Sequence, residues 1–285
     1  MMLLDKISDK IFLQDAIFSV KTCISKSLKL ILCMFFDLAF FVVYGMLSAP
    51  VFSKLTDHVI ILGAFVSDAM KKTGRTYVNN QSLIDLILKP QIWPFFLKFL
   101  FLLALLGAIV YIVYCVFQGI NWKLSSELAG YDVSWRQYLK AFAKINLLWF
   151  GLFVIYYFTN LFFAVRKTII LKFNPTYAPN YFWEVAFAIL LFVALYFMIL
   201  TYVSGTIKIG LKAAIQAWKD FAPPIIIIML VFLAIDWIML KAGLWKIEAA
   251  YFLGVVLFLP ALTITKVYIF RVAAKLCKNG ILPQY

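Results

Sequence analysis

Long apolar runs dominate the chain and alternate with short polar connectors. A helix of about 20 predominantly apolar residues matches a hydrocarbon core of about 30 Å. Lipid offers no partner to an open strand edge, and none of the runs shows the alternation of barrel strands. The pattern therefore predicts an all-α polytopic membrane protein with six spans that form a single membrane domain over residues 1–285. The predicted spans are 28–50, 95–118, 145–165, 182–204, 223–241 and 248–267.

The connectors before the first, third and fifth spans share an apolar stripe at helical spacing with basic residues opposite. The stripes are Ala16, Ile17, Val20, Cys23, Ile24 and Leu28; Trp135, Tyr138, Leu139, Phe142 and Ile145; and Ile207, Leu211, Ala214, Ile215, Trp218 and Ala222. We predict three repeated units, 1–119, 120–205 and 206–285, each a cytoplasmic amphipathic helix followed by a membrane hairpin. Alternatively, any basic connector at headgroup level becomes amphipathic without a true repeat.

Composition supports a membrane location, because 65% of the residues are hydrophobic and 14% are charged. Soluble domains average about 45–50% apolar and about 25% charged residues. The 27 Lys and Arg residues outnumber the 13 Asp and Glu residues, giving a net charge of +14, and they border the apolar runs. We therefore expect a bilayer with anionic headgroups as the partner, and no nucleic acid.

The distribution of basic residues predicts the orientation. About 16 Lys and Arg residues fall on the side of both termini and about 10 on the other, which predicts cytoplasmic termini in a multi-pass protein of the cell membrane. On the outer side, apolar residues from Leu55 to Met70 recur at helical spacing. They predict a helix on the outer leaflet or over the bundle, followed by a polar turn and a short helix ending near Lys89.

Charged side chains inside spans are the main functional candidates, because each is costly in lipid unless it meets protein, water or a counter-ion. Asp37 lies about nine residues into the first span and therefore near the bilayer centre. Lys98, Asp236 and Glu184 lie near the outer ends of their spans, where Lys98 and Asp236 are at comparable depth and can pair. A proton or cation path through Asp37 and Asp236 is one interpretation. The other is structural, either ion pairing or a protonated carboxyl group satisfied by a neighbouring helix.

Enzymatic chemistry finds little support in the sequence. No nucleotide-binding, metal-ligand or nucleophile signature occurs, and His58 is the single histidine. Neither Asp37 nor Asp236 follows Gly-x-Gly, and their different predicted depths disfavour an aspartyl-protease dyad, whose carboxylates lie about 3 Å apart. We expect a protein without enzymatic activity, cofactor or metal.

Two segments of the last predicted unit, AAIQAWKDFAPPIIIIMLVFL and LFLPALTITKVYIFRVAAK, resemble prokaryotic six-span membrane families. These include the membrane region attached to some glycerophosphodiester phosphodiesterases. The residues that carry the resemblance are Trp218, Lys219, Pro260, Tyr268 and Arg271. The resemblance implies a similar fold and no activity, because these 285 residues contain no counterpart of the phosphodiesterase catalytic domain.

Two classes of function fit these observations. The first is a membrane scaffold, an accessory subunit of a membrane protein partner, or a lipid-organising protein. The second is a transporter or permease subunit for a small solute that uses Asp37 and Asp236. Pro223, Pro224 and Pro260 interrupt or flank spans without the paired inverted pattern of transporter repeats, so we favour the first class.

Overall fold

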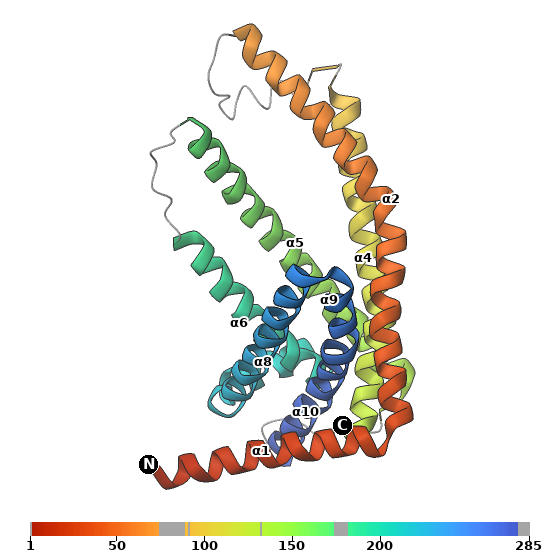
Figure 1. Cartoon of the computed structure of the whole chain (residues 1–285), viewed down its shortest axis with the longest axis vertical. Helices are drawn as coiled ribbons and strands as arrows, with labels where there is room; N and C mark the ends of the chain where they lie inside the picture. The colour runs from red at the N-terminus through yellow and green to blue at the C-terminus, as the bar shows by residue number, and fades with distance from the viewer. Residues whose placement is uncertain (1, 74–88, 91, 132, 174–181, 279–285) are drawn as a thin grey trace. The chain divides into compact units, whose positions relative to one another are not determined.

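The computed structural model describes residues 2–73, 89–90, 92–131, 133–173 and 182–278 (Figure 1). Helices account for nearly all of this part of the chain, and it contains no strand, which confirms the all-α prediction. The helices are α1 (Met2–Ser25), α2 (Ser27–Thr73), α4 (Trp93–Leu128), α5 (Trp135–Phe173), α6 (Phe182–Ser204), α7 (Ile207–Gln216), α8 (Trp218–Trp245), α9 (Ile247–Leu253), the π-helix η1 (Gly254–Phe258) and α10 (Leu259–Lys278).

Six helical segments are long and apolar enough to cross a membrane, as predicted. They are Ser27–Phe65, Trp93–Leu128, Trp135–Asn160, Phe182–Ser204, Trp218–Leu244 and Ile247–Ala273. Only 6–22% of the residues in their most apolar windows are buried, so the chain itself leaves most of their apolar surface uncovered. Such a surface suits contact with lipid, where the backbone must satisfy its hydrogen bonds within the helix.

Several helices extend further than the apolar runs predict. α2 contains 47 residues, about 70 Å at 1.5 Å per residue, and continues through Pro50 into the segment predicted as a separate outer helix. α5 begins at Trp135, so the predicted helix before the third span forms the first turns of the span itself. Extending an existing helix is easier than starting a new one, and residues 135–145 before the third span contain no Gly or Pro. The predicted polar turn and short helix fall largely on residues 74–88, outside the described residues.

Contacts divide the chain into two units. The first comprises Met1–Leu38 and Phe117–Tyr285, and the second comprises Ala39–Val116. Within the second unit, aromatic rings join α2 to α4: the ring centroids are 5.9 Å apart for Phe40 and Tyr114, and 5.8 Å apart for Phe65 and Phe95. This division is based on contacts within the chain, and its boundaries fall inside the predicted unit 1–119. The threefold repeat itself stays a prediction.

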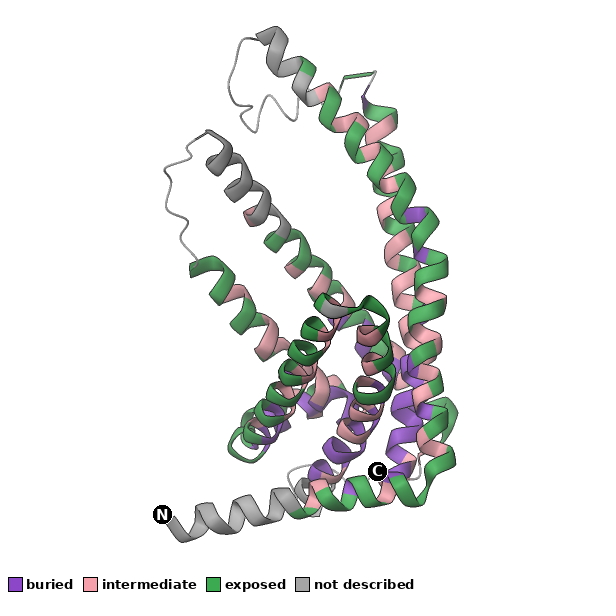
Figure 2. Ribbon diagram, in the orientation of Figure 1, coloured by how far each residue is buried: buried purple, intermediate pink, exposed green. Residues whose placement is uncertain are grey.

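An aromatic core holds the first unit together. The ring of Trp122 on α4 lies 5.3 Å from that of Tyr202 on α6 and 5.8 Å from that of Phe270 on α10. The hydroxyl of Tyr202 also donates a hydrogen bond to Asn146 on α5. Buried residues gather on α4, α6 and α10 around this core (Figure 2).

Two glycines shape the junction of α6 and α7. Gly205 turns the chain after α6 with a φ of +63°, a left-handed conformation that glycine adopts without a steric cost. Gly210 lies so close to α6 that an added Cβ would be 2.5 Å from the Cα of Thr201 and 2.7 Å from the Oγ of Ser204. The absence of a side chain at Gly210 thus allows α7 to pack directly against the end of α6.

We expect Gly210→Ala to lower the stability of the protein by about 1–3 kcal/mol, because the new methyl group meets the backbone Cα of Thr201, which cannot move aside without shifting α6. The measurement is the Tm in detergent. Gly151→Ala is the matched control, since nothing lies within 4 Å of its added Cβ. That control is expected to be neutral, or stabilising by about 0.5–1 kcal/mol. Equal Tm values for Gly210→Ala and the wild type would contradict the close approach.

Candidate functional site

Three buried polar side chains from different helices meet in the first unit: Asp37 of α2, Gln118 of α4 and Lys266 of α10. Gln118 Nε2 donates to Asp37 Oδ1 at 2.8 Å. Lys266 Nζ donates to Asp37 Oδ1 at 3.0 Å, to Asp37 Oδ2 at 3.3 Å and to Gln118 Oε1 at 3.0 Å. The side chains of Asp37 and Lys266 are 1% and 7% exposed. We call these three residues the Asp37 cluster.

The Asp37 cluster pairs its charges within itself. The three ammonium hydrogens of Lys266 have three oxygen atoms within hydrogen-bond distance, and the carboxylate of Asp37 accepts from two different helices. An unpaired Lys or Asp at the centre of a transmembrane helix costs about 2.5–3.5 kcal/mol on insertion scales. Pairing explains how both residues reside in an apolar segment, and it ties α2, α4 and α10 to one another.

The Asp37 cluster is the inner end of a row of polar contacts between α2 and α4. Next along the row, Asn121 Nδ2 donates to the carbonyl oxygen of Cys33 at 3.0 Å. At its other end, Lys29 Nζ lies 2.8 Å from Glu127 Oε2, and the side chain of Lys29 is 45% exposed. The α2 members are four residues apart and therefore share one face of the helix. We call this row the polar seam; it comprises Lys29, Cys33, Asp37, Gln118, Asn121 and Glu127.

A second lysine borders the polar seam. The side chain of Lys123 is fully buried, and its Nζ lies 3.1 Å from Glu127 Oε1. It also lies 5.6 Å from the centroid of the Trp135 ring, a cation–π distance. Glu127 therefore has a lysine ammonium group at each of its two carboxylate oxygens. These two contacts hold Glu127 in place at the outer end of the polar seam.

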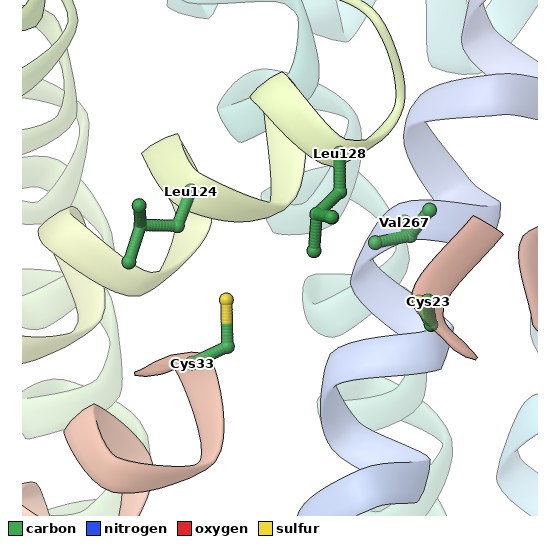
Figure 3. Packing of buried hydrophobic residues seen from close by; sticks show 5 residues of the cluster. All are labelled: Cys23, Cys33, Leu124, Leu128 and Val267. Atoms are coloured by element: carbon green, nitrogen blue, oxygen red, sulfur yellow. The ribbon is translucent and has the colours of Figure 1, made fainter. Parts of the chain in front are cut away.

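Apolar side chains pack beside the polar seam. Cys23, Cys33, Leu124, Leu128 and Val267 form one buried cluster drawn from α1, α2, α4 and α10 (Figure 3). Val267 follows Lys266 directly, so α10 contributes to both the charged and the apolar contacts. Burial raises the pKa of Cys23 to about 11, partly opposed by the charge of Arg271. The Cys23 thiol therefore stays protonated at neutral pH and packs as an apolar group.

The predicted site residues are found in different surroundings. Asp37 is buried in the cluster described above, whereas Asp236 on α8 and Glu184 on α6 are exposed. Lys98 is exposed and belongs to the second unit. The structure brings Asp37 together with Lys266 and Gln118, neither of which was a predicted site residue. Pairing of Lys98 with Asp236, which belong to different units, stays a prediction.

Lys266 is absent from the predicted site residues because the predicted last span ends at residue 267. A lysine one residue from a span end is expected at headgroup level. The structure extends this span to Ala273, which places Lys266 about two turns inside it. Apolar residues continue past Lys266 in the sequence VYIF, and this signal could have identified it as an intramembrane charge.

Comparison with protein-family models, with curated proteins and with solved structures found no match to this chain. The resemblance to six-span membrane families therefore stays a prediction. Among the described residues, no group of three or more His, Cys, Asp or Glu side chains is arranged to hold a metal ion. The function must accordingly be argued from the site and the exposed surfaces.

We expect Asp37→Asn and Lys266→Met to destabilise the protein by about 3–5 kcal/mol each, because each leaves a buried charge without its partner. The double variant Asp37→Asn/Lys266→Met removes both charges and should lose much less than the sum of the two. The measurement is the Tm of the wild type, of each single variant and of the double variant, all in choline chloride. Lys29→Met is the matched control, since its half-exposed ion pair is worth only about 0–1 kcal/mol. Additive losses in the double variant would contradict the pairing.

Proposed function

We propose that this protein is a non-enzymatic integral membrane protein, a scaffold, accessory subunit or lipid-organising protein, that holds anionic lipids at its cytoplasmic face. The observation that carries the proposal is the exposed side of α7 and of the first turn of α8. Lys208, Lys212 and Lys219 are exposed there, together with Ile215 and Trp218. We call these five residues the α7 basic face.

The opposite side of α7 explains why this face points outward. Gly210, Ala213 and Ala214 are buried, and the carbonyl oxygen of Ala214 accepts a hydrogen bond from the Tyr196 hydroxyl of α6 at 2.8 Å. Small residues thus attach α7 to α6, so its long basic and apolar side chains are left for other partners.

The chemistry of the α7 basic face suits the headgroup region of a bilayer. Ile215 and Trp218 are 67% and 57% exposed, which is unfavourable in water but suitable at a membrane interface. Each Lys near an anionic surface contributes about 1 kcal/mol of attraction. A short helix with both features favours anionic lipids over zwitterionic ones.

α1 also presents exposed basic side chains together with exposed apolar ones. It packs against α10, and the chain turns sharply between α1 and α2 (Figure 1). Ser19 and Cys23 are the fully buried residues of its described side chains, while Ile17, Val20 and Ile24 are exposed. Of the predicted apolar stripe, Cys23 therefore contacts protein, and the larger residues face outward beside Lys21 and Lys26. This arrangement supports lipid contact by a second helix.

We expect the variant Lys208→Gln/Lys212→Gln/Lys219→Gln to retain at least about tenfold less phosphatidylglycerol than the wild type, since about 1 kcal/mol is lost per charge. The measurement is native mass spectrometry after gentle extraction, with phosphatidylcholine as the reference lipid. Lys241→Gln is the control, because Lys241 is also exposed on α8 beside a tryptophan, with its Nζ 5.7 Å from the Trp237 ring centroid. Unchanged retention in the triple variant would contradict the proposal. A stoichiometric protein partner in the same spectra would favour an accessory subunit.

The proposed orientation places α7 and both termini in the cytoplasm. Native Cys23 is fully buried and is therefore a poor reporter of sidedness. Lys219→Cys and Glu248→Cys both replace exposed residues, at the start of α8 and in α9. A membrane-impermeant maleimide should label Glu248→Cys in intact cells and Lys219→Cys only after permeabilisation, with the native chain as the blank. The reverse pattern would contradict the orientation.

A transporter or permease subunit for a small solute, using Asp37 and Asp236, is the second candidate function. One observation favours it: the Asp37 cluster holds a positive charge among oxygen atoms inside a segment of membrane-spanning length. Loss of solute flux in Asp37→Asn, with assembly retained, would support this candidate.

A further inference from the structure

One side of α8 packs against the rest of the chain, and another side does not. On the packed side, the rings of Phe232 and Phe258 of η1 have centroids 5.4 Å apart, and a Cβ added at Gly254 of η1 would lie 3.1 Å from the Cε of Met239. On the open side, five large apolar residues are each 59–82% exposed. We call these residues the α8 seam; they are Leu230, Leu233, Trp237, Leu240 and Leu244.

The α8 seam has the spacing of a coiled-coil contact. Its residues follow one another at intervals of three, four, three and four positions, which is the alternation of a and d positions in a heptad repeat. Residues at a and d face the partner helix, and residues at e and g border the contact on its two edges. With Leu230 at a, Asp236 occupies a g position and Lys241 the e position that follows it.

The two charges at the edges of the α8 seam are complementary to those of a second copy. In a parallel pair of helices, a residue at g meets the residue of the partner that lies five positions further along, at the next e. Asp236 and Lys241 are five positions apart, carry opposite charges and are both exposed. Two copies related by a two-fold axis therefore place Asp236 of each opposite Lys241 of the other.

Asp236 requires such a partner because of its depth. It lies eight residues before the end of its span at Leu244, about 12 Å along the axis, and its short side chain cannot reach the headgroups from there. Within the part of the chain that the structure describes, no hydrogen bond or ion pair reaches its carboxylate. Asp37, in contrast, is paired with Lys266. Lipid tails offer no counter-ion, and charged side chains inside a membrane segment almost always face protein or water.

We propose that the α8 seam is the contact between two copies of this chain, which pair in parallel with two reciprocal ion pairs between Asp236 and Lys241. A two-fold axis along the bilayer normal keeps both copies in the same orientation, so equivalent helices run parallel, as this charge pairing requires. Lipid is as apolar as leucine, so close packing and polar contacts have to select the partner. The α7 basic face lies outside the seam, and the proposal does not depend on lipid binding there.

The first test exchanges the charges. Asp236→Lys and Lys241→Asp each place like charges opposite one another at two points of the contact, so each should raise the Kd of self-association at least about tenfold. The double variant Asp236→Lys/Lys241→Asp restores opposite charges and should associate as the wild type does. The measurement is energy transfer between donor-tagged and acceptor-tagged copies in liposomes at several protein-to-lipid ratios. A wild type that does not associate, or a double variant as weak as the single ones, would overturn the proposal.

Mixing the two single variants shows whether the ion pairs form between copies. A copy with Asp236→Lys and a copy with Lys241→Asp match each other at both points, although neither matches itself. Donor-tagged Asp236→Lys should therefore associate with acceptor-tagged Lys241→Asp about as well as two wild-type copies do, which also shows that both variants fold. A mixed pair no stronger than either variant alone would overturn the proposal. That result is expected if Asp236 pairs with Lys98 of its own chain.

Cysteine cross-linking in native membranes locates the contact. Leu240→Cys lies at a d position, where the same residue of both copies faces the two-fold axis, and it should form a disulfide-linked dimer on oxidation with copper phenanthroline. Ile238→Cys is the matched control, because Ile238 is also exposed and lies two residues away, outside the α8 seam. The native chain, with its own cysteines, is the blank. Equal dimer yields at both positions, or cross-linking of Leu240→Cys to a different protein, would overturn the proposal.

Discussion

A carboxylate and an ammonium group that reside in an apolar helical bundle must be brought together, because neither is tolerated alone in that medium. Asp37 is on the first of the six described helical segments that are long and apolar enough to cross a membrane, Lys266 is on the last, and Gln118 of α4 bonds to both. Lipid tails are as apolar as leucine side chains, so burial of apolar surface selects helix partners only weakly within a bilayer. The Asp37 cluster supplies the directional contacts that define how α2, α4 and α10 pack.

The rest of the first unit is arranged around this contact by close packing. The Trp122, Tyr202 and Phe270 rings join α4, α6 and α10 about one turn from Gln118 on α4, and they extend the contact to α6. α6 in turn holds α7 through the close approach at Gly210. The inner charged contact and the outer basic face are therefore connected by a continuous path of packed side chains. That path gives the proposed lipid-binding surface a fixed support.

The sequence predicted the parts of the fold that depend on local composition. Six apolar runs gave six helices of spanning length, and the predicted span 182–204 matches the helix Phe182–Ser204. The predicted helix ends were less accurate. α2 continues through Pro50, and α5 includes the connector before the third span. A drop in hydropathy marks the end of an apolar surface, whereas a helix ends only where its backbone hydrogen bonds are no longer continued.

By itself, the sequence determined the helical class, the six helices of spanning length, the excess of basic residues at their borders and the place of Asp37 within an apolar run, because each depends on the nature of neighbouring residues. Only the tertiary structure decided which cation Asp37 meets. Lys98 and Lys266 are both lysines near predicted span ends, and Lys266 is separated from Asp37 by 229 positions. Contacts between helices so distant in sequence depend on the direction in which each face points. Helix ends and close approaches such as that at Gly210 set those directions, and hydropathy does not record them.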